Sequence, residues 1–141
     1  MRILLVGASG FIGRHLAAAL HPRHEVLWAA RRPPPAPLPY RHVPVDMARD
    51  TSPGVWEPRL AGVDVVVNAA GVLREQGTQS FDALHRRAPI ALFDACLAQR
   101  IPRVVQVSAL GADEEARSAY HLSKKAADDH LRRLSLSSVI R

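Results

Sequence analysis

The chain has 141 residues, of which 48% are hydrophobic and 23% are charged, and both fractions are ordinary for a globular protein. A chain of this length buries about two-thirds of the surface that its unfolded form exposes, which excludes disorder as its main state. No apolar stretch in the sequence approaches the ~18 residues that a membrane span requires. The formal net charge of +6 favours anionic partners without choosing among nucleotides, nucleic acid and acidic surfaces.

Cysteine and histidine usage excludes two further classes of site. Cys96 is the only cysteine in the sequence, so an intrachain disulfide and a cysteine-based zinc site are excluded. A single cysteine suits a reducing compartment, and we expect a cytoplasmic location. The seven histidines show no metal-ligand spacing, so we predict no metal site. Scattered basic residues and an aromatic fraction of only 5% argue against a nucleic-acid partner, because a stacking platform is lacking.

In the first part of the chain, strands are predicted over residues 3–6 and 24–30, with a helix over residues 14–20 between them. Five prolines between residues 33 and 39 exclude a helix or a central strand there. This segment is interpreted as a surface strap in the polyproline II conformation. A docking site for a proline-binding partner is the alternative.

Further strands are predicted over residues 41–45, 63–67, 104–107 and 138–140, and further helices over residues 52–60, 78–99 and 116–134. Pro89 is expected to kink or break the second of these helices, and Asp128 and Asp129 are expected on a solvated face of the third. Strands that alternate with helices predict a Rossmann-type doubly wound parallel sheet with helices on both faces. Ligands of such sheets bind at the carboxyl ends of the strands.

The turn after the first strand contains a glycine triplet, Gly7, Gly10 and Gly13. In a strand–turn–helix context, the first glycine allows a tight turn, the second lets the backbone approach a pyrophosphate, and the third lets the helix pack on the strand. The N-terminus of the following helix offers free N–H groups to phosphates. This pattern predicts a dinucleotide site.

The end of the second strand indicates which dinucleotide is preferred. An acidic residue there would bind a free ribose 2′-hydroxyl, but the sequence has Arg31 and Arg32. Guanidinium groups suit a 2′-phosphate through bidentate hydrogen bonds. NADP(H) is therefore expected in preference to NAD(H), and the alternative is that both arginines are only solvated charges.

A Tyr-x-x-x-Lys pair, Tyr120 and Lys124, lies in the last predicted helix. Residues four apart share one helix face, and a neighbouring ammonium stabilises a phenolate. Such a tyrosine can give or take a proton at a carbonyl or alcohol oxygen. Ser108 ends the preceding strand, and its hydroxyl could hold the substrate oxygen.

Five segments in this order resemble the short-chain dehydrogenase/reductase superfamily over nearly the whole chain: GASGFIG, VDM, NAAG, VSALGAD and YHLSK. The glycine spacing is that of the extended and atypical branches, which include NAD(P)-dependent epimerases and dehydratases. The chain is also similar to the atypical group related to the NADPH-carrying accessory subunit of respiratory complex I. The resemblance implies oxidoreductase or epimerase/dehydratase chemistry on a small-molecule carbonyl or alcohol.

The resemblance also implies roles for individual residues. Tyr120 is the expected acid/base, Lys124 binds the nicotinamide ribose, and Ser108 positions the substrate. The expected cofactor-binding residues are Gly7, Ser9, Gly10, Phe11, Ile12, Gly13, Arg31, Arg32, Asp46, Met47, Asn68, Ala69, Ala70 and Gly71.

Two departures from the family limit these expectations. His85 stands at a helix position where active members often carry asparagine, which affects any proton relay through that residue. Members of these branches continue beyond the sixth strand with the part that forms most of the substrate pocket. We therefore expect residues 1–141 to be the dinucleotide-binding domain alone, without that part. The alternative function is a nucleotide-binding module without turnover, such as a redox sensor or an assembly subunit, and a homodimer is expected by resemblance.

Overall fold

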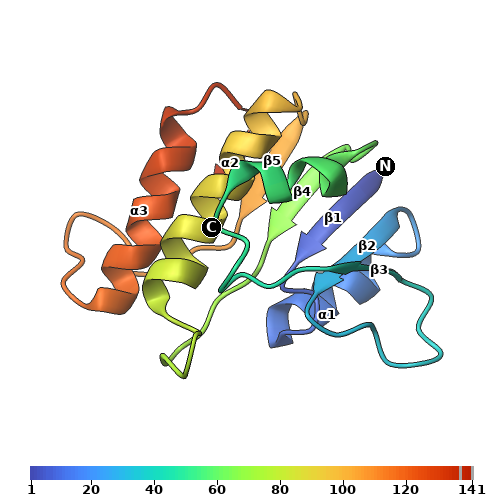
Figure 1. Ribbon diagram of the computed structural model, residues 1–141, viewed down its shortest axis with the longest axis horizontal. Helices are drawn as coiled ribbons and strands as arrows, with labels where there is room; N and C mark the ends of the chain where they lie inside the picture. The colour runs from blue at the N-terminus through green and yellow to red at the C-terminus, as the bar shows by residue number, and fades with distance from the viewer. Residues whose placement is uncertain (137, 141) are drawn as a thin grey trace.

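The fold is known from a computed structural model, which describes residues 1–136 and 138–140. Its centre is a parallel sheet with the strand order β3-β2-β1-β4-β5-β6 (Figure 1). The strands span β1 Arg2–Val6, β2 Glu25–Ala30, β3 Arg41–Pro44, β4 Val65–Asn68, β5 Arg103–Gln106 and β6 Ser138–Ile140. The predicted doubly wound parallel sheet is thereby confirmed. The strand order reverses between β1 and β4, and such switch points are where these sheets bind ligands.

Helices cover both faces of the sheet, as the pattern predicted. They span α1 Phe11–Leu20, α2 Ala88–Ala98 and α3 Ala119–Arg133, with short helical turns η1 Pro53–Val55 and η2 Glu57–Leu60. α1 lies on one face, whereas α2 and α3 lie together on the other (Figure 1). The predicted weak helix over residues 52–60 is thus two separate turns of 3₁₀ helix, because Pro58 has no N–H group with which to continue the helix that starts at Pro53.

Alternate residues of β1 supply the two cores. Ile3 and Leu5 pack in the core beneath α1, whereas Leu4 and Val6 pack in the core beneath α2 and α3. Successive side chains of a strand point to opposite faces, so a strand buried on both faces is apolar throughout. The uninterrupted apolar run from Ile3 to Val6 is therefore explained by burial of β1 on both faces of the sheet.

The segment predicted as one helix over residues 78–99 has two hydrogen-bonding patterns. Residues Asp82–Arg87 form a π-helical segment, η3, and the regular helix α2 starts at Ala88. Pro89 stands in the first turn of α2, where its missing N–H donor is harmless. The predicted break at Pro89 is not found, because the helix continues without interruption through that residue and only its hydrogen-bonding pattern changes, from π to α, just before it. Such wide turns occur frequently at functional sites.

Candidate functional site

The glycine turn brings α1 directly onto the end of β1. Gly7 has a φ of +80°, and a Cβ atom on it would lie 2.6 Å from the backbone nitrogen of Ala70. A Cβ atom on Gly13 would lie 2.1 Å from the Gly7 carbonyl oxygen. Both distances are far below van der Waals contact, so only glycine allows these backbones to approach as they do.

The N-terminus of α1 is open toward the end of the sheet. Gly10 is its N-cap, and in the part of the chain that the structure describes no side chain caps it or places a carboxylate in its first turn. The first N–H groups of a helix have no intrahelical partner and carry partial positive charge. A backbone turn of this kind, with glycine at residues 7 and 10, fits the pyrophosphate of a dinucleotide.

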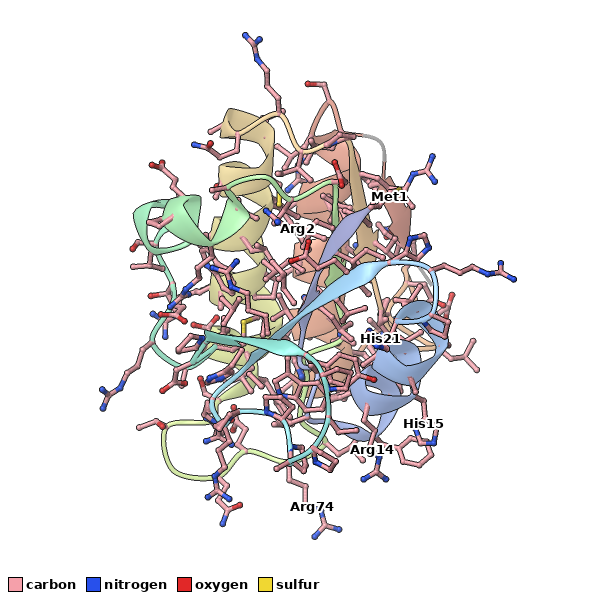
Figure 2. All side chains as sticks on the ribbon, turned by 90° about the vertical axis from the view of Figure 1, so that its right-hand side faces the viewer. Met1, Arg2, Arg14, His15, His21 and Arg74 are labelled. Carbon is pink, nitrogen blue, oxygen red and sulfur yellow. The ribbon has the colours of Figure 1, made fainter. Side chains whose placement is uncertain are left out.

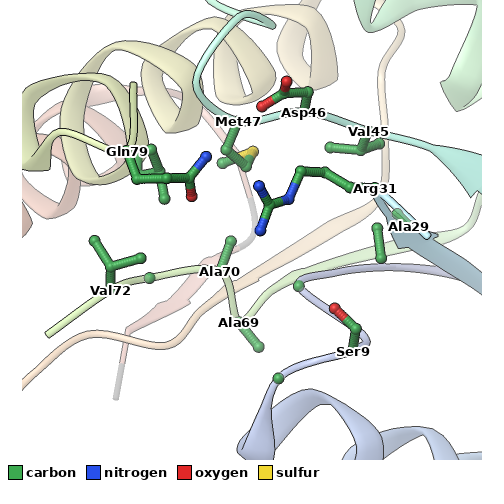
Figure 3. A pocket seen from close by; sticks show the side chains of 15 residues that line it. Ser9, Ala29, Arg31, Val45, Asp46, Met47, Ala69, Ala70, Val72 and Gln79 are labelled. Atoms are coloured by element: carbon green, nitrogen blue, oxygen red, sulfur yellow. The ribbon is translucent and has the colours of Figure 1, made fainter. Parts of the chain in front are cut away.

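A cavity of about 150 Å³ lies beside this turn, at the carboxyl ends of β1 to β4. Arg31 follows β2 and extends its guanidinium into the cavity toward Gln79 and Met47 (Figure 3). Arg32 does not line the cavity, and its carbonyl oxygen instead accepts a hydrogen bond from Trp28 Nε1 at 3.2 Å. The structure therefore separates the two arginines that the sequence grouped. The residues that line this first cavity are Gly7, Ser9, Gly10, Ala29, Ala30, Arg31, Val45, Asp46, Met47, Ala69, Ala70, Gly71, Val72, Gln79 and Leu84.

A second cavity of about 290 Å³ continues the first toward α3. The two cavities share five lining residues and so form one groove across the edge of the sheet: Gly10, Ala69, Ala70, Gly71 and Val72. Ser108, Tyr120 and Lys124 line the second cavity together. The structure thus gathers the three residues that the sequence singled out for chemistry, and places them at the opposite end of the groove from Arg31.

Lys124 is held from below by the backbone. Its side chain is only 4% exposed, and its Nζ donates a hydrogen bond of 2.8 Å to the carbonyl oxygen of Val107. Burial lowers the pKa of Lys124, and the Asp128 carboxylate opposes that shift. The Lys124 ammonium is therefore held on a backbone carbonyl in the lining of the cavity that Tyr120 also lines.

Ser108 is engaged by a residue that the sequence analysis assigned to solvent. Its hydroxyl donates a hydrogen bond to Asp128. The expectation that Asp128 is solvated is wrong, because its side chain is 1% exposed. Burial raises the pKa of Asp128, while the Ser108 hydrogen bond and the Lys124 charge oppose that shift. With its proton directed at Asp128, Ser108 offers only lone pairs to a ligand.

Two of the expected cofactor-binding residues lie beneath the groove rather than in its wall. Asn68 is fully buried, donates from Nδ2 to Gln106 Oε1 at 2.8 Å, and accepts from the Ala70 amide at 3.2 Å. It thereby shapes the loop that lines both cavities. Gly13 is buried in the contact between α1 and the Gly7 turn. Both residues act on the shape of the groove.

Sequence reasoning missed several residues that form the groove. Gln79 faces Arg31 across the first cavity (Figure 3), and Leu73 lines the second. Both belong to the irregular segment between β4 and η3. Leu73 lies where no periodicity or motif places side chains, and Gln79 was wrongly included in the helix predicted over residues 78–99, which begins only at Phe81. For Asp128 a signal existed, because it follows Lys124 by four residues and so shares its helix face.

Other kinds of site receive no support from the described residues. Among them no three histidine, cysteine or acidic side chains are grouped so that they could hold a metal ion. No described helix combines the length and apolarity that crossing a membrane requires. In Figure 2, Arg2 lies at the start of the sheet, whereas Arg14 and Arg74 lie toward its opposite end.

Comparison with known proteins finds relatives that match nearly the whole chain. A family model described as NAD(P)H-binding matches residues 7–140. The chain is 30% identical to the ceramide reductase of Caulobacter vibrioides, over 98% of this chain and 44% of that protein. It is 29% identical to the UDP-2-acetamido-2,6-beta-L-arabino-hexul-4-ose reductase of Pseudomonas aeruginosa, over 93% of this chain and 31% of that protein. The chain thus spans less than half the length of these curated relatives.

Solved structures share the fold. A Bacillus halodurans protein provisionally assigned as an NAD-dependent epimerase/dehydratase superimposes with a TM-score of 0.85 at 26% identity, over 99% of this chain and 68% of that one. The UDP-glucuronic acid 4-epimerase of Bacillus cereus, solved with NAD, gives a TM-score of 0.75 at 20% identity, over 99% and 55%. The expected likeness to short-chain dehydrogenases/reductases of the epimerase/dehydratase type is confirmed. The chain belongs to the family described as NAD(P)H-binding, and its fold is that of NAD-dependent epimerase/dehydratase-like proteins.

Proposed function

We propose that residues 1–141 are the NADP(H)-binding part of a reductase that acts on a carbonyl or alcohol group. The observation that carries this proposal is the single groove that joins the uncapped N-terminus of α1 to the Tyr120–Lys124 pair. One end of it fits a dinucleotide, and the other supplies acid/base groups. The two curated relatives, both named as reductases, support reduction in preference to epimerisation.

Within this proposal, Arg31 selects the phosphorylated cofactor. Its guanidinium extends into the cavity where β2 ends (Figure 3), the position at which this fold meets the adenine ribose. A guanidinium binds a phosphate through two parallel charge-assisted hydrogen bonds. The turn around Gly7 and Gly10 would hold the pyrophosphate, and Asp46 and Met47 would flank the adenine.

Tyr120 is proposed as the acid/base, and the bound nicotinamide supplies a hydride to the substrate carbon. The Tyr120 phenol donates a proton to a substrate oxygen during reduction and regains a proton afterwards. The Lys124 ammonium, fixed by the Val107 carbonyl, stabilises the phenolate that remains and is placed to bind the nicotinamide ribose. Ser108, which donates to Asp128, accepts a hydrogen bond from a donor group of the substrate.

An apolar substrate group is favoured by the rim of the second cavity. Phe11, Ile12 and Leu73 line that cavity with 72%, 48% and 83% of their surface exposed. Exposed apolar side chains gathered around a cavity mark a binding surface rather than ordinary surface. The substrate is therefore proposed to carry a hydrocarbon portion beside its carbonyl.

Calorimetric titration with NADPH and NADH tests the cofactor assignment. Arg31→Ala is expected to weaken NADPH binding by roughly 10- to 100-fold, because a hydrogen-bonded charged group contributes about 1.5–3 kcal/mol. NADH binding should change by less than about threefold. Arg32→Ala is the matched control, since Arg32 lies outside the cavity lining. Equal affinity of the unaltered chain for NADH and NADPH would contradict the role of Arg31.

A nucleotide-binding module without turnover is the second candidate. It is favoured by Ser108, whose hydroxyl proton is directed at Asp128 and not at the cavity. NADPH oxidation, followed by absorbance with a panel of lipid and nucleotide-sugar ketones, separates the two functions. Turnover that is lost in Tyr120→Phe supports the reductase. Because residues 1–141 are proposed as the cofactor-binding part alone, turnover is the deciding result, and any turnover that depends on Tyr120 rules out the module.

A further inference from the structure

His85 connects two parts of the groove wall that are distant in sequence. Its Nε2 accepts a hydrogen bond of 3.0 Å from the amide of Val72, in the loop after β4. Its Nδ1 lies 3.0 Å from the hydroxyl of Ser123, in the first turns of α3. The side chain is 1% exposed and belongs to the π-helical segment η3. One imidazole thus joins the loop of both cavities to the helix that carries Tyr120.

The directions of these hydrogen bonds fix the tautomer. The Ser123 hydroxyl donates to the carbonyl oxygen of Tyr120 at 2.8 Å, so only its lone pairs face His85. Since Nε2 accepts from the Val72 amide, the single ring proton of a neutral imidazole resides on Nδ1 and is donated to Ser123. The resulting chain runs from Val72 through His85 and Ser123 to Tyr120, with every proton assigned.

The surroundings keep this imidazole neutral. Burial, followed by the nearby Lys124 ammonium, lowers the pKa of His85 to about 4. Lys124 and Tyr120, both on α3, are the titratable groups that face the ring. Protonation would place an N–H on Nε2 against the Val72 N–H, which already points there. Neither ring nitrogen of His85 is therefore available to take up a further proton near neutral pH.

Ring contacts also connect His85 to Tyr120. The imidazole stacks on Phe81 with centroids 5.3 Å apart and meets Tyr120 edge-on, also at 5.3 Å. Phe81 meets Tyr120 edge-on at 5.7 Å. Gly71 leaves space for this arrangement, because a Cβ atom there would lie 3.3 Å from His85 Nε2. Edge-to-face contacts of this kind restrict the tilt of a ring.

We propose that His85 is a positioning residue for Tyr120, a neutral Nδ1-protonated imidazole that fixes the Tyr120 ring relative to the loop at residues 70–72 and relays no protons. This inference rests on the proposed acid/base role of Tyr120. An asparagine at this position could not fill the same ring-shaped space between Phe81 and Tyr120. The histidine departure from the family pattern thus has a structural use of its own.

NMR of the full chain with labelled histidine and tyrosine tests the proposal without cofactor or substrate. The imidazole nitrogens of His85 should show the Nδ1-protonated tautomer and stay neutral from pH 8 to pH 5. In His85→Phe, which keeps a ring but no hydrogen bonds, the Val72 amide should exchange with solvent at least tenfold faster. The ring signals of Tyr120 should shift, while those of Tyr40, the other tyrosine, stay in place as an internal control.

Ser123→Ala provides a second variant that leaves the imidazole intact. It should shift the Tyr120 signals while the Val72 amide remains protected from exchange. The substitution removes the hydrogen bonds that join Ser123 to His85 and Tyr120 but leaves the one between Val72 and His85. An Nε2-protonated ring, a His85 pKa near 6.5, or Tyr120 signals unchanged in both variants would overturn the proposal. These readouts do not depend on NADPH, so a chain that fails to bind NADPH refutes the proposed function and leaves the result for His85 readable.

Discussion

Replacing Gly13 by alanine tests whether the groove depends on the close approach of α1 to the end of β1. A Cβ atom at this position would lie 2.1 Å from the Gly7 carbonyl oxygen and 2.8 Å from Ala8 Cα. Both neighbours are backbone atoms, so no side-chain rotation can relieve the overlap. α1 must therefore move outward by about 1 Å to restore ordinary contact distances near 3.4 Å.

The expected cost follows from the overpacking that this shift entails. Small-to-large changes in a packed core destabilise by roughly 1–3 kcal/mol, and about 0.5–1 kcal/mol is regained because alanine favours the helix over glycine. For a domain of this size, 1 kcal/mol corresponds to about 4 °C in Tm, so the net cost of up to about 2.5 kcal/mol lowers Tm by up to about 10 °C. The displaced N-terminus should also weaken NADPH binding by at least tenfold.

Gly54→Ala is the matched control, because a Cβ atom on Gly54 meets nothing within 4 Å. Thermal unfolding followed by circular dichroism, together with titration of NADPH, gives both quantities for the two variants. Gly54→Ala should leave both within experimental scatter. If Gly13→Ala were as stable as the unaltered chain and bound NADPH equally well, the tight contact would have no energetic weight and the reasoning would fail.

Cys96 is fully buried and burial raises its pKa to about 12, so a thiol reagent should label it in denatured protein but not in native protein at pH 8. The pKa of His85 is lowered from 6.5 to about 4, so the unfolded chain takes up a proton at this site at higher pH than the folded one. The free energy of unfolding should therefore fall by about 3 kcal/mol between pH 6.5 and pH 4 on this account, and His85→Phe should lack that contribution in denaturant titrations at each pH.

The backbone of the groove could be predicted from the sequence because local rules determine it. The apolar runs before Gly7 and Asn68 and the glycine spacing are short-range signals, and in a parallel sheet all such strand ends meet at one edge. The pairing of Tyr120 with Lys124 follows from helix geometry alone. These features needed no knowledge of how the strands are ordered.

Side-chain partners across elements could not be predicted in the same way. Asn68 and Gln106 are register partners on β4 and β5, and Asp128 meets Ser108 twenty residues away. Both pairs depend on strand order and on the rotation of α3 over the sheet. Because acidic residues are usually exposed, we expected Asp128 on the solvated face of its helix. The neighbouring Ala127 and Leu131 are buried, however, and Asp128 is buried with them.

The distribution of buried polar side chains sets the groove apart from the rest of the molecule. All those recorded as buried among the described residues gather near the carboxyl ends of β4 and β5, around the second cavity: Asn68, His85, Gln106, Lys124 and Asp128. Burying such groups costs free energy unless each finds a partner. Of the described atoms there, Gln106 Nε2 and Asp128 Oδ1 make no hydrogen bond of good geometry, although the Gln106 amide lies close enough to Asp128 to oppose the rise of its pKa.

A core selected for stability alone would replace these groups with apolar side chains of similar volume. The buried interior of β1 is apolar, with Ile3, Leu4, Leu5 and Val6 following Arg2, so the fold does not require polar groups at its centre. What the buried polar side chains do is direct donors and acceptors. Lys124 is fixed on a carbonyl and Ser108 on a carboxylate. His85 reaches the backbone carbonyl of Tyr120 through Ser123 and contacts the Tyr120 ring edge-on. The free energy that this arrangement costs is therefore best explained by the chemistry of the groove above it.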